Sequence, residues 1–409
     1  MSLRNSWPVA IARTFIVGII FLAGIHACVW TQLVGLAIYR DLIHRPGDVQ
    51  AVMNVTKTHF VVLMTFLTSW INPCKVKMTW DTSVNPSMFR KDFGGNLISN
   101  LSPNSVFISN HQIYTDWLFL WFISYTSRLS DSVYIILKDL SKIPILGYGM
   151  KNFNFLFLSR KWENDKVILT NQLNEIDANA RGMGPANGVV QVANHNSSTI
   201  KWPQGKTDQI WPYQLILFPE GTVTSLRTVK KSAEYCASKN LERMEHVLLP
   251  RIRGLFLALR KLRNSVEVVY DFTTAYSNLL PEEFGEDKFS LKRFYILGHG
   301  PPVVNYYVRS YKISEIPLGT DTDDIDDADP KDLEAFERWL YTIWEEKDDL
   351  MKYFYKHGTF INESKPTEET VVADYKLRNS LEVLTPFIAM FSTFMILRLI
   401  WIAIWKLVG

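Results

Sequence analysis

Two long apolar segments, one near each end of the chain, constrain its fold more than any other feature. Residues 14–39 form a run of 26 without Asp, Glu, Lys or Arg, and an α-helix needs roughly 20 residues to cross a bilayer. Residues 383–405 form a second apolar run, interrupted only by Arg398. A buried core helix is the alternative for any apolar run, but the length of these two favours the membrane. We therefore predict a membrane span at 14–39 and a C-terminal transmembrane helix at 383–405.

A shorter apolar run covers residues 60–71. Its length fits a buried, re-entrant or interfacial helix better than a full span. Basic residues flank the first span on both sides, with slightly more after it, which leans toward a cytosolic position for residues 40–57. A helical hairpin that dips into one leaflet fits the same charges. Residues 1–75 are therefore predicted to form an N-terminal membrane segment, with the depth of 60–71 left open.

Composition excludes several classes of protein. The 409 residues are 47% hydrophobic and 21% charged, which rules out a disordered or collagen-like chain. Forty-four Lys and Arg against 41 Asp and Glu leave a formal charge of +3, too small an excess to indicate a nucleic-acid partner. The three cysteines are far apart and form neither a disulfide framework nor a zinc site. We expect no metal site, no cofactor and no nucleic acid.

Between the apolar ends, short β-rich runs alternate with helical stretches. This alternation predicts an α/β domain at 76–320, with a mostly parallel sheet flanked by helices. The β-rich runs are 105–109, 133–137, 153–158, 214–218, 266–271, 294–297 and 303–308, and the helical stretches are 116–127, 163–179, 229–241 and 252–262.

Two polar segments interrupt or follow this pattern. Residues 181–209 are rich in Gly, Asn, Ser and Pro and are predicted to form a surface loop. Residues 321–334 carry eight acids and one Lys, which is typical of a solvated linker. Asp329-Pro330 is a helix-start signal, and an amphipathic pattern continues to about Tyr355. Residues 321–375 are therefore predicted to be an acidic linker and an amphipathic helix.

Polar residues follow one of the apolar strands directly. Asn110 and His111 lie between the run at 105–109 and the helical stretch that begins at Asp116, a junction at which open α/β sheets bind ligands. Five residues along a regular helix turn about 140° beyond a full turn, so His111 and Asp116 can meet only if the histidine lies on the turn. Asp116 would then hold one imidazole nitrogen and free the other to take a proton from an alcohol. A capping Asn-His pair with an unrelated aspartate is the alternative, and spacing alone does not decide.

Two further strands end in residues suited to an anionic substrate. Residues 218–222, Phe-Pro-Glu-Gly-Thr, place a carboxylate, a glycine and a hydroxyl on one loop, where exposed backbone N–H groups could receive an anion. Arg160 closes the run at 153–158, and arginine suits bidentate phosphate contact. A surface ion pair is the plainer interpretation of Arg160 taken alone. The sequence contains neither a G-x-S-x-G elbow nor an H-E-x-x-H motif, so serine-hydrolase and metalloprotease chemistry have no support.

Taken in order, these segments resemble the motifs of the glycerolipid acyltransferase family, the PlsC-type enzymes that acylate lysophospholipids. The family's N-H-x4-D motif matches at His111 and Asp116, and its F-P-E-G-T motif matches residue for residue at 218–222. Its strand closing on arginine matches at Arg160 and its apolar run ending in proline at 247–250. The resemblance covers about residues 100–310, and only the polar loop 181–209 departs from it.

The resemblance implies an enzyme with defined substrates and residue roles. It implies acyl-CoA as co-substrate, a lysophospholipid as acceptor, His111 as general base and Asp116 as its orienting partner. It also implies that Lys138, which precedes an I-P-x-x-G segment, and Arg160, Glu220, Gly221 and Thr222 hold the phosphate or glycerol part. Glu220 is expected to bind a hydroxyl or a cation, because a carboxylate repels phosphate.

The helical segment 336–355, with Gln112 and Trp117, looks like the eukaryotic lysophosphatidylinositol and lysocardiolipin branch of the family. The alternatives are an enzyme that makes phosphatidate and a membrane scaffold with a vestigial domain, although the intact motifs argue against decay. The expected location is the endoplasmic reticulum membrane with a cytosolic catalytic domain. We accordingly expect no glycan on the acceptor sequence at Asn196.

Overall fold

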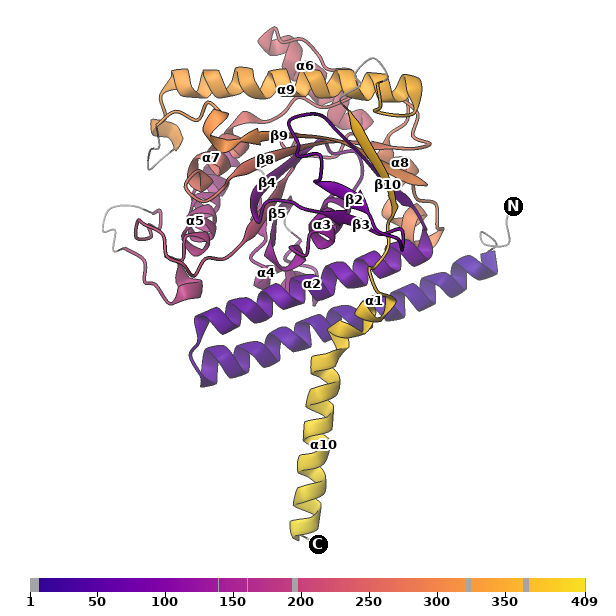
Figure 1. Ribbon diagram of the computed structural model, residues 1–409, viewed down its shortest axis with the longest axis vertical. Coiled ribbons are helices and arrows are strands. Elements are labelled where there is room, and N and C mark those ends of the chain that lie inside the picture. Colours follow the sequence, from indigo (N-terminus) through magenta and orange to yellow (C-terminus); the bar gives the residue numbers. More distant parts are fainter. Residues whose placement is uncertain are drawn as a thin grey trace.

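The computed structural model describes residues 7–138, 140–159, 161–192, 198–320, 322, 325–362 and 368–408. Its centre is an eight-stranded sheet in the order β10-β1-β9-β8-β4-β7-β5-β6 (Figure 1). The strands are β1 Lys75–Trp80, β4 Asn104–Ser109, β5 Val133–Lys138, β6 Leu156–Leu158, β7 Tyr213–Leu217, β8 Val268–Tyr276, β9 Val303–Lys312 and β10 Glu369–Asp374. Outside this sheet, β2 Phe89–Lys91 pairs with β3 Leu97–Ser99.

Most neighbouring strands of the large sheet are parallel. β4 pairs in parallel with β7 and with β8, β5 with β7 and with β6, and β1 with β9. Only β8 with β9 and β1 with β10 are antiparallel. The predicted α/β class with a mostly parallel sheet is therefore confirmed.

Helices cover both faces of this sheet because its central strand is apolar on both sides. All six residues of β4 are buried, and alternate side chains of a strand point to opposite faces. Phe107 packs in a core with α2 Pro46–Ile71 and α3 Asp116–Thr126. Val106 and Ile108 pack in a second core with α5 Trp162–Ala180, α7 Ile252–Leu262 and α9 Pro330–His357. The remaining α-helices of the described domain are α4 Leu146–Asn152, α6 Leu226–Lys239 and α8 Gly285–Lys288.

Three helices of the described chain are long and apolar enough to cross a membrane. α1 Trp7–Gly35 continues as the π-helix η2 Leu36–Leu42, α2 follows it, and α10 Ile388–Val408 follows the 3-10 segment η8 Ser380–Phe387. The most apolar window of α10 is 0% buried, that of α1 is 22% buried and that of α2 is 67% buried. The short run predicted at 60–71 is the second half of α2. The first half of this helix was not predicted to be apolar, because polar residues such as Asn54 and Lys57 lower its mean hydropathy. Both of these residues are buried in the structure.

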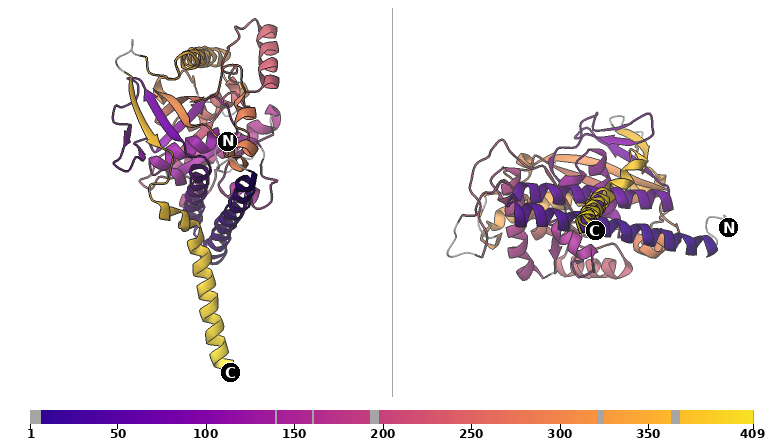
Figure 2. Two further views of the ribbon diagram at one scale, coloured as in Figure 1. Left: turned by 90° about the vertical axis from the view of Figure 1, so that its right-hand side faces the viewer. Right: turned by 90° about the horizontal axis from the view of Figure 1, so that it is seen from below.

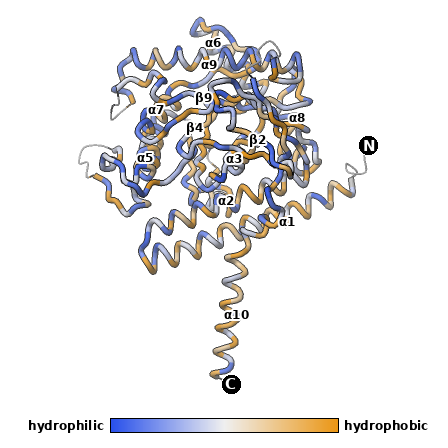
Figure 3. Tube along the Cα trace, in the orientation of Figure 1, coloured by the Kyte–Doolittle hydropathy of each residue, from blue (hydrophilic) through white to orange (hydrophobic). Residues whose placement is uncertain are grey.

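The three apolar helices differ in direction. α1 and α2 run side by side along the underside of the sheet domain, whereas α10 leaves the domain crosswise to them (Figures 1 and 2). Hydrophobic residues extend along the whole of α10 (Figure 3). The sheet domain and the N-terminal hairpin thus form one packed unit from which α10 projects.

Two of the expected strands are corrected by the structure. Residues 294–297 are not a strand, because the π-helix η5 Lys292–Ile296 turns Phe294 into the core against Phe119. The run at 153–158 is a strand only from Leu156.

The predicted polar loop at 181–209 contains the short helix η4 Pro185–Asn187 and a bridge between Val192 and Lys201. Asn196 lies outside the described residues. Strands from residues 75–80 and 369–374 share the sheet of the predicted catalytic segment, and the predicted domain boundaries remain predictions.

Candidate active site

The sheet brings the candidate residues into one row. β4, β7, β5 and β6 are adjacent and parallel, so their carboxyl ends lie along the same edge. His111 follows β4, Glu220 follows β7, and Lys138 is the exposed last residue of β5. Arg160 follows β6 in the sequence but lies outside the described residues.

His111 and Asp116 make the contact that their spacing left open. α3 begins at Asp116, so His111 lies on the turn before the helix, as the geometry requires. The Nδ1 atom of His111 lies 2.7 Å from the Oδ2 atom of Asp116. The histidine side chain is 16% exposed and the aspartate side chain 1%. A solvent-accessible imidazole is therefore held by a buried carboxylate.

Backbone groups fix that carboxylate in place. The same Oδ2 atom accepts hydrogen bonds from the backbone N–H groups of Gln112 at 2.7 Å and Ile113 at 3.0 Å. The Oδ1 atom accepts from the hydroxyl of Tyr276 at the end of β8. A carboxylate that only accepts requires a proton on Nδ1 of the neutral imidazole, which leaves Nε2 as the acceptor. The imidazole also stacks on the Phe218 ring, with centroids 4.2 Å apart.

The turn that carries His111 is bound to β8 by Asn110. The Asn110 side chain donates to the Thr274 carbonyl at 3.0 Å and accepts from the Thr274 N–H at 2.8 Å. The side-chain amide of Asn110 thus hydrogen-bonds to β8 as a backbone peptide group of β4 would, directly after β4 has ended. The turn is consequently anchored on both sides of the histidine, by Asn110 before it and Asp116 after it.

Glu220 supports the same turn from the neighbouring strand. It is 2% exposed, and its carboxylate accepts from the backbone N–H of His111 at 3.1 Å and of Leu248 at 3.4 Å. Burial raises the pKa of Glu220 to about 8. The predicted contact of Glu220 with substrate remains a prediction, because its carboxylate faces the protein backbone.

Comparisons with known proteins show to which family this chain belongs. The family model described as "Acyltransferase" matches residues 90–270, and "Acyltransferase C-terminus" matches residues 295–381. A 2-acyl-1-lysophosphatidylinositol acyltransferase of Saccharomyces cerevisiae is 39% identical over 372 residues, which cover 89% of each chain. The chain belongs to the acyltransferase family.

More distant acyltransferases are also similar to this chain. A lysophosphatidylinositol acyltransferase 10 of Caenorhabditis elegans is 29% identical over 272 residues, 64% of this chain and 56% of its own. A lysocardiolipin acyltransferase 1 of Gallus gallus is 26% identical over 264 residues, with the same two coverages. The family resemblance predicted from the motifs is therefore confirmed.

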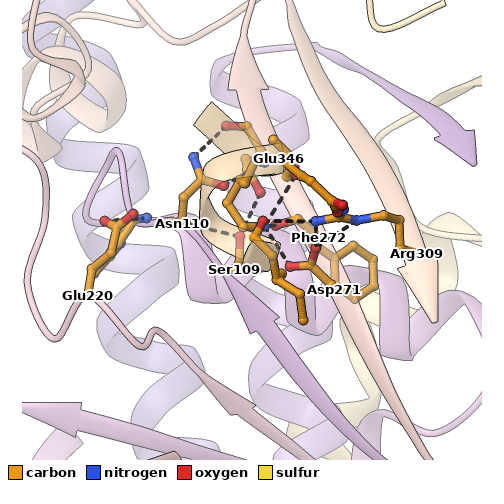
Figure 4. A network of polar contacts seen from close by, with 12 residues as sticks. Ser109, Asn110, Glu220, Asp271, Phe272, Arg309 and Glu346 are labelled. Atoms are coloured by element: carbon orange, nitrogen blue, oxygen red, sulfur yellow. Dashed lines mark hydrogen bonds and ion pairs between the residues drawn. The ribbon is translucent and has the colours of Figure 1, made fainter. Parts of the chain in front are cut away.

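The acyltransferase has a second polar centre that sequence reasoning missed. Lys347 on α9 is fully buried and donates to Asp271 Oδ1 at 2.6 Å, to the Phe272 carbonyl at 2.9 Å and to Thr273 at 3.2 Å. Arg309 on β9 donates to the other oxygen of Asp271 at 2.7 Å. Figure 4 shows that Ser109 and Asn110 lie between this centre and Glu220. The three β8 residues that accept hydrogen bonds from Lys347 thus immediately precede Thr274, the residue to which the Asn110 side chain is hydrogen-bonded.

Long-range contacts explain why these residues were missed. Tyr276 reaches Asp116 across 160 positions and Lys347 reaches Asp271 across 76. The sequence gives no spacing signal at such separations, and Lys347 looks like one more surface charge on an amphipathic helix. Only the three-dimensional structure shows that Tyr276 and Lys347 contact residues at or beside the site.

Proposed function

We propose that the protein is a membrane-bound lysophospholipid O-acyltransferase. It moves a fatty acyl group from acyl-CoA to the free glycerol hydroxyl of a lysophospholipid, with lysophosphatidylinositol as the favoured acceptor. The observation that carries the proposal is the buried carboxylate that holds an accessible imidazole 2.7 Å away. The similarity to a yeast acyltransferase named for 2-acyl-1-lysophosphatidylinositol supports the acceptor class.

The mechanism follows from the tautomer of His111. Its Nε2 atom takes the proton of the acceptor hydroxyl while the oxygen attacks the thioester carbonyl carbon. The C–S bond then breaks, and His111 returns the proton to the leaving CoA sulfur. Asp116 stabilises the imidazolium that forms between these two steps. The acyl group passes directly to the acceptor, so the protein needs no acylated serine or cysteine.

The residue roles divide between positioning and substrate contact. Lys138, Arg160, Gly221 and Thr222 are proposed to contact the phosphate or glycerol part of the acceptor, with acyl-CoA as co-substrate and no cofactor. Lys138 is exposed at the same edge of the sheet as His111, which is compatible with this role.

The membrane helices fit amphiphilic substrates. We propose residence in the endoplasmic reticulum membrane with the catalytic domain in the cytosol, where an anchored enzyme meets both substrates at the bilayer surface. The exposed apolar surface of α10 supports membrane insertion, since such a surface is costly in water.

A second candidate acceptor has specific support. A probable 1-acyl-sn-glycerol-3-phosphate acyltransferase 5 of Arabidopsis thaliana is 28% identical over 262 residues. The same His111–Asp116 pair would acylate lysophosphatidate, giving phosphatidate, by the same chemistry. The two candidates differ only in the head group that the phosphate carries. A non-catalytic membrane scaffold, the remaining alternative, leaves the His111–Asp116 geometry unexplained.

The deciding experiment is acyl transfer by membranes that carry the wild-type protein or the His111→Ala variant. Labelled acyl-CoA is offered with lysophosphatidylinositol, lysocardiolipin, lysophosphatidate and lysophosphatidylcholine, each as a defined positional isomer. We expect transfer to lysophosphatidylinositol and a loss of about 10²- to 10⁴-fold without the imidazole. Transfer to another acceptor would correct the head group, and transfer independent of His111 would refute the mechanism.

A further inference from the structure

The loop after β7 flanks His111 at two points. Glu220 accepts the backbone N–H of His111 at 3.1 Å. Thr224 donates to the His111 carbonyl, through its N–H at 2.8 Å and its hydroxyl at 3.1 Å. The three residues between these contacts, Gly221, Thr222 and Val223, are therefore held beside the catalytic histidine.

Arg251 lies against Gly221, the first residue of this segment. Its backbone N–H donates to the Pro219 carbonyl at 2.8 Å, which ties the residue to the start of the loop. Gly221 has φ +68°, and a Cβ atom there would lie 3.0 Å from Nε and 3.1 Å from Cζ of Arg251. The guanidinium consequently lies against the Gly221 backbone, where a side chain on residue 221 would displace it.

Several donors at this place have no acceptor. Across the part of the chain that the structure describes, the exposed Arg251 guanidinium makes no hydrogen bond or ion pair, and the backbone N–H groups of Thr222 and Val223 have no acceptor. The neighbouring carboxylate of Glu220 is buried and already accepts from the backbone N–H groups of His111 and Leu248, and within the described residues it makes no ion pair with Arg251. A guanidinium that lies against Gly221, next to two backbone N–H groups without an acceptor, favours an anion at this place.

We propose that Arg251, with the N–H groups of Thr222 and Val223, binds the phosphate of the acceptor lysophospholipid. This inference rests on the proposed function and adds a binding residue to it. The acceptor is favoured over CoA because the reacting hydroxyl and the phosphate of a lysophospholipid share one glycerol. A phosphate held by the segment beside His111 keeps that hydroxyl within reach of the imidazole. Binding through Arg251 also uses the planar donor geometry that a lysine lacks.

The test compares Arg251→Gln, Arg251→Lys and the control Arg90→Gln, which removes an exposed charge from β2. Steady-state rates are measured against lysophosphatidylinositol and against acyl-CoA. We expect Arg251→Gln to raise KM for the lysophospholipid about 10- to 100-fold, the range for one charged hydrogen-bonded contact. We expect kcat and the KM for acyl-CoA to change less than about twofold, Arg251→Lys to be intermediate and Arg90→Gln to match wild type.

A second substrate separates the two possible sources of phosphate. A KM for acyl-CoA that rises with Arg251→Gln, without a rise for acyl-pantetheine, would place a CoA phosphate at Arg251 and overturn the assignment to the acceptor. Unchanged KM values for both substrates would overturn the subsite altogether.

Inhibition by sn-glycerol 3-phosphate gives a second readout, because this probe carries the phosphate and the glycerol but no acyl chain. We expect this probe to compete with the lysophospholipid in wild type and to compete about tenfold more weakly in Arg251→Gln. Equal inhibition of the two would contradict the proposal. Thermal unfolding of each variant verifies that it is folded, and Gly221→Ala, which displaces the guanidinium, should reproduce the KM effect if Arg251→Gln is unstable. Wild-type membranes without transfer to any acceptor would instead refute the proposed function.

Discussion

At the scale of single residues, the proposed catalytic histidine, His111, depends on donors that surround its partner Asp116. Tyr276 is the one side-chain hydroxyl bonded to Asp116 in the described structure. Burial and the nearby Asp116 hold the pKa of Tyr276 well above its usual value, so the phenol remains a proton donor at neutral pH. The phenol draws charge from the carboxylate that orients His111, and Tyr276 is therefore a positioning residue.

The Tyr276→Phe variant should reveal this role as a loss of kcat rather than of substrate binding. Without the hydroxyl, the Oδ1 atom of the buried Asp116 loses its side-chain donor, so the carboxylate holds the imidazole of His111 less firmly. A hydrogen bond to a charged group contributes about 1.5–3 kcal/mol, and we therefore expect kcat to fall about 10- to 100-fold while both KM values stay within about twofold of wild type. Steady-state rates against both substrates measure this split, and a wild-type kcat would show that Tyr276 has only a packing role.

Glu220 should make folding stability depend on pH. Burial raises its pKa from 4.5 to about 8 in the folded protein, so the folded state binds more protons than the unfolded state between these values. The free energy of unfolding should therefore fall as pH rises through that window. Glu220→Gln removes the titration, and its unfolding free energy should fall less across the same window. Denaturant midpoints at pH 5 and pH 8 check this, and equal pH slopes for both proteins would contradict it.

At the scale of helices and strands, the parts of the site that lie on strand ends were predictable and the supporting parts were not. The apolar run at 105–109 and the helical stretch at 116–127 sufficed to predict the strand and the start of α3, whereas spacing left the contact between His111 and Asp116 undecided. β10 escaped prediction because only Ala373 among its six residues is buried, so its sequence shows no hydrophobic alternation. Its partner β1 lies almost 300 positions earlier in the chain, and no local pattern reports such a pairing.

α9 is the element whose contribution is easiest to isolate. Lys347→Met leaves Asp271 buried with one cation fewer, and breaking a buried ion pair costs about 3–5 kcal/mol. We expect a matching loss in the free energy of unfolding. We also expect a lower kcat, because β8 binds Lys347 and, through Thr274, also binds Asn110 on the turn that carries His111. Chemical denaturation and acyl-transfer rates measure the two effects. Lys352→Met, an exposed position on the same helix, should be neutral, and a wild-type stability for Lys347→Met would refute the role of the buried network.

At the scale of the whole molecule, the directions of the helices bear on how the protein sits in a bilayer. α10 projects crosswise to α1 and α2 (Figure 2). A bilayer that α10 crosses therefore has the α1–α2 hairpin lying along its surface. α2 packs into the sheet domain through its buried half, including Phe60 and Leu63. In that placement the hairpin would join the lipid surface to the helix α3, whose first residue is Asp116.

This arrangement favours the hairpin alternative over the span predicted at 14–39: α10 crosses the membrane and α1, despite its length, does not. Glycosylation tags test it: one variant carries an N-x-T tag at the N-terminus and another carries the tag at the C-terminus, each matched by an N-x-A control. With a cytosolic catalytic domain, we expect a glycan on the C-terminal tag alone, because only α10 leads to the lumen. A glycan on the N-terminal tag would mean that α1 spans the bilayer, and the hairpin would then have to separate from the domain that its buried residues now pack against. Since α2 is two-thirds buried over its most apolar window, that separation would expose core residues to lipid or water, and this cost argues for the in-plane hairpin.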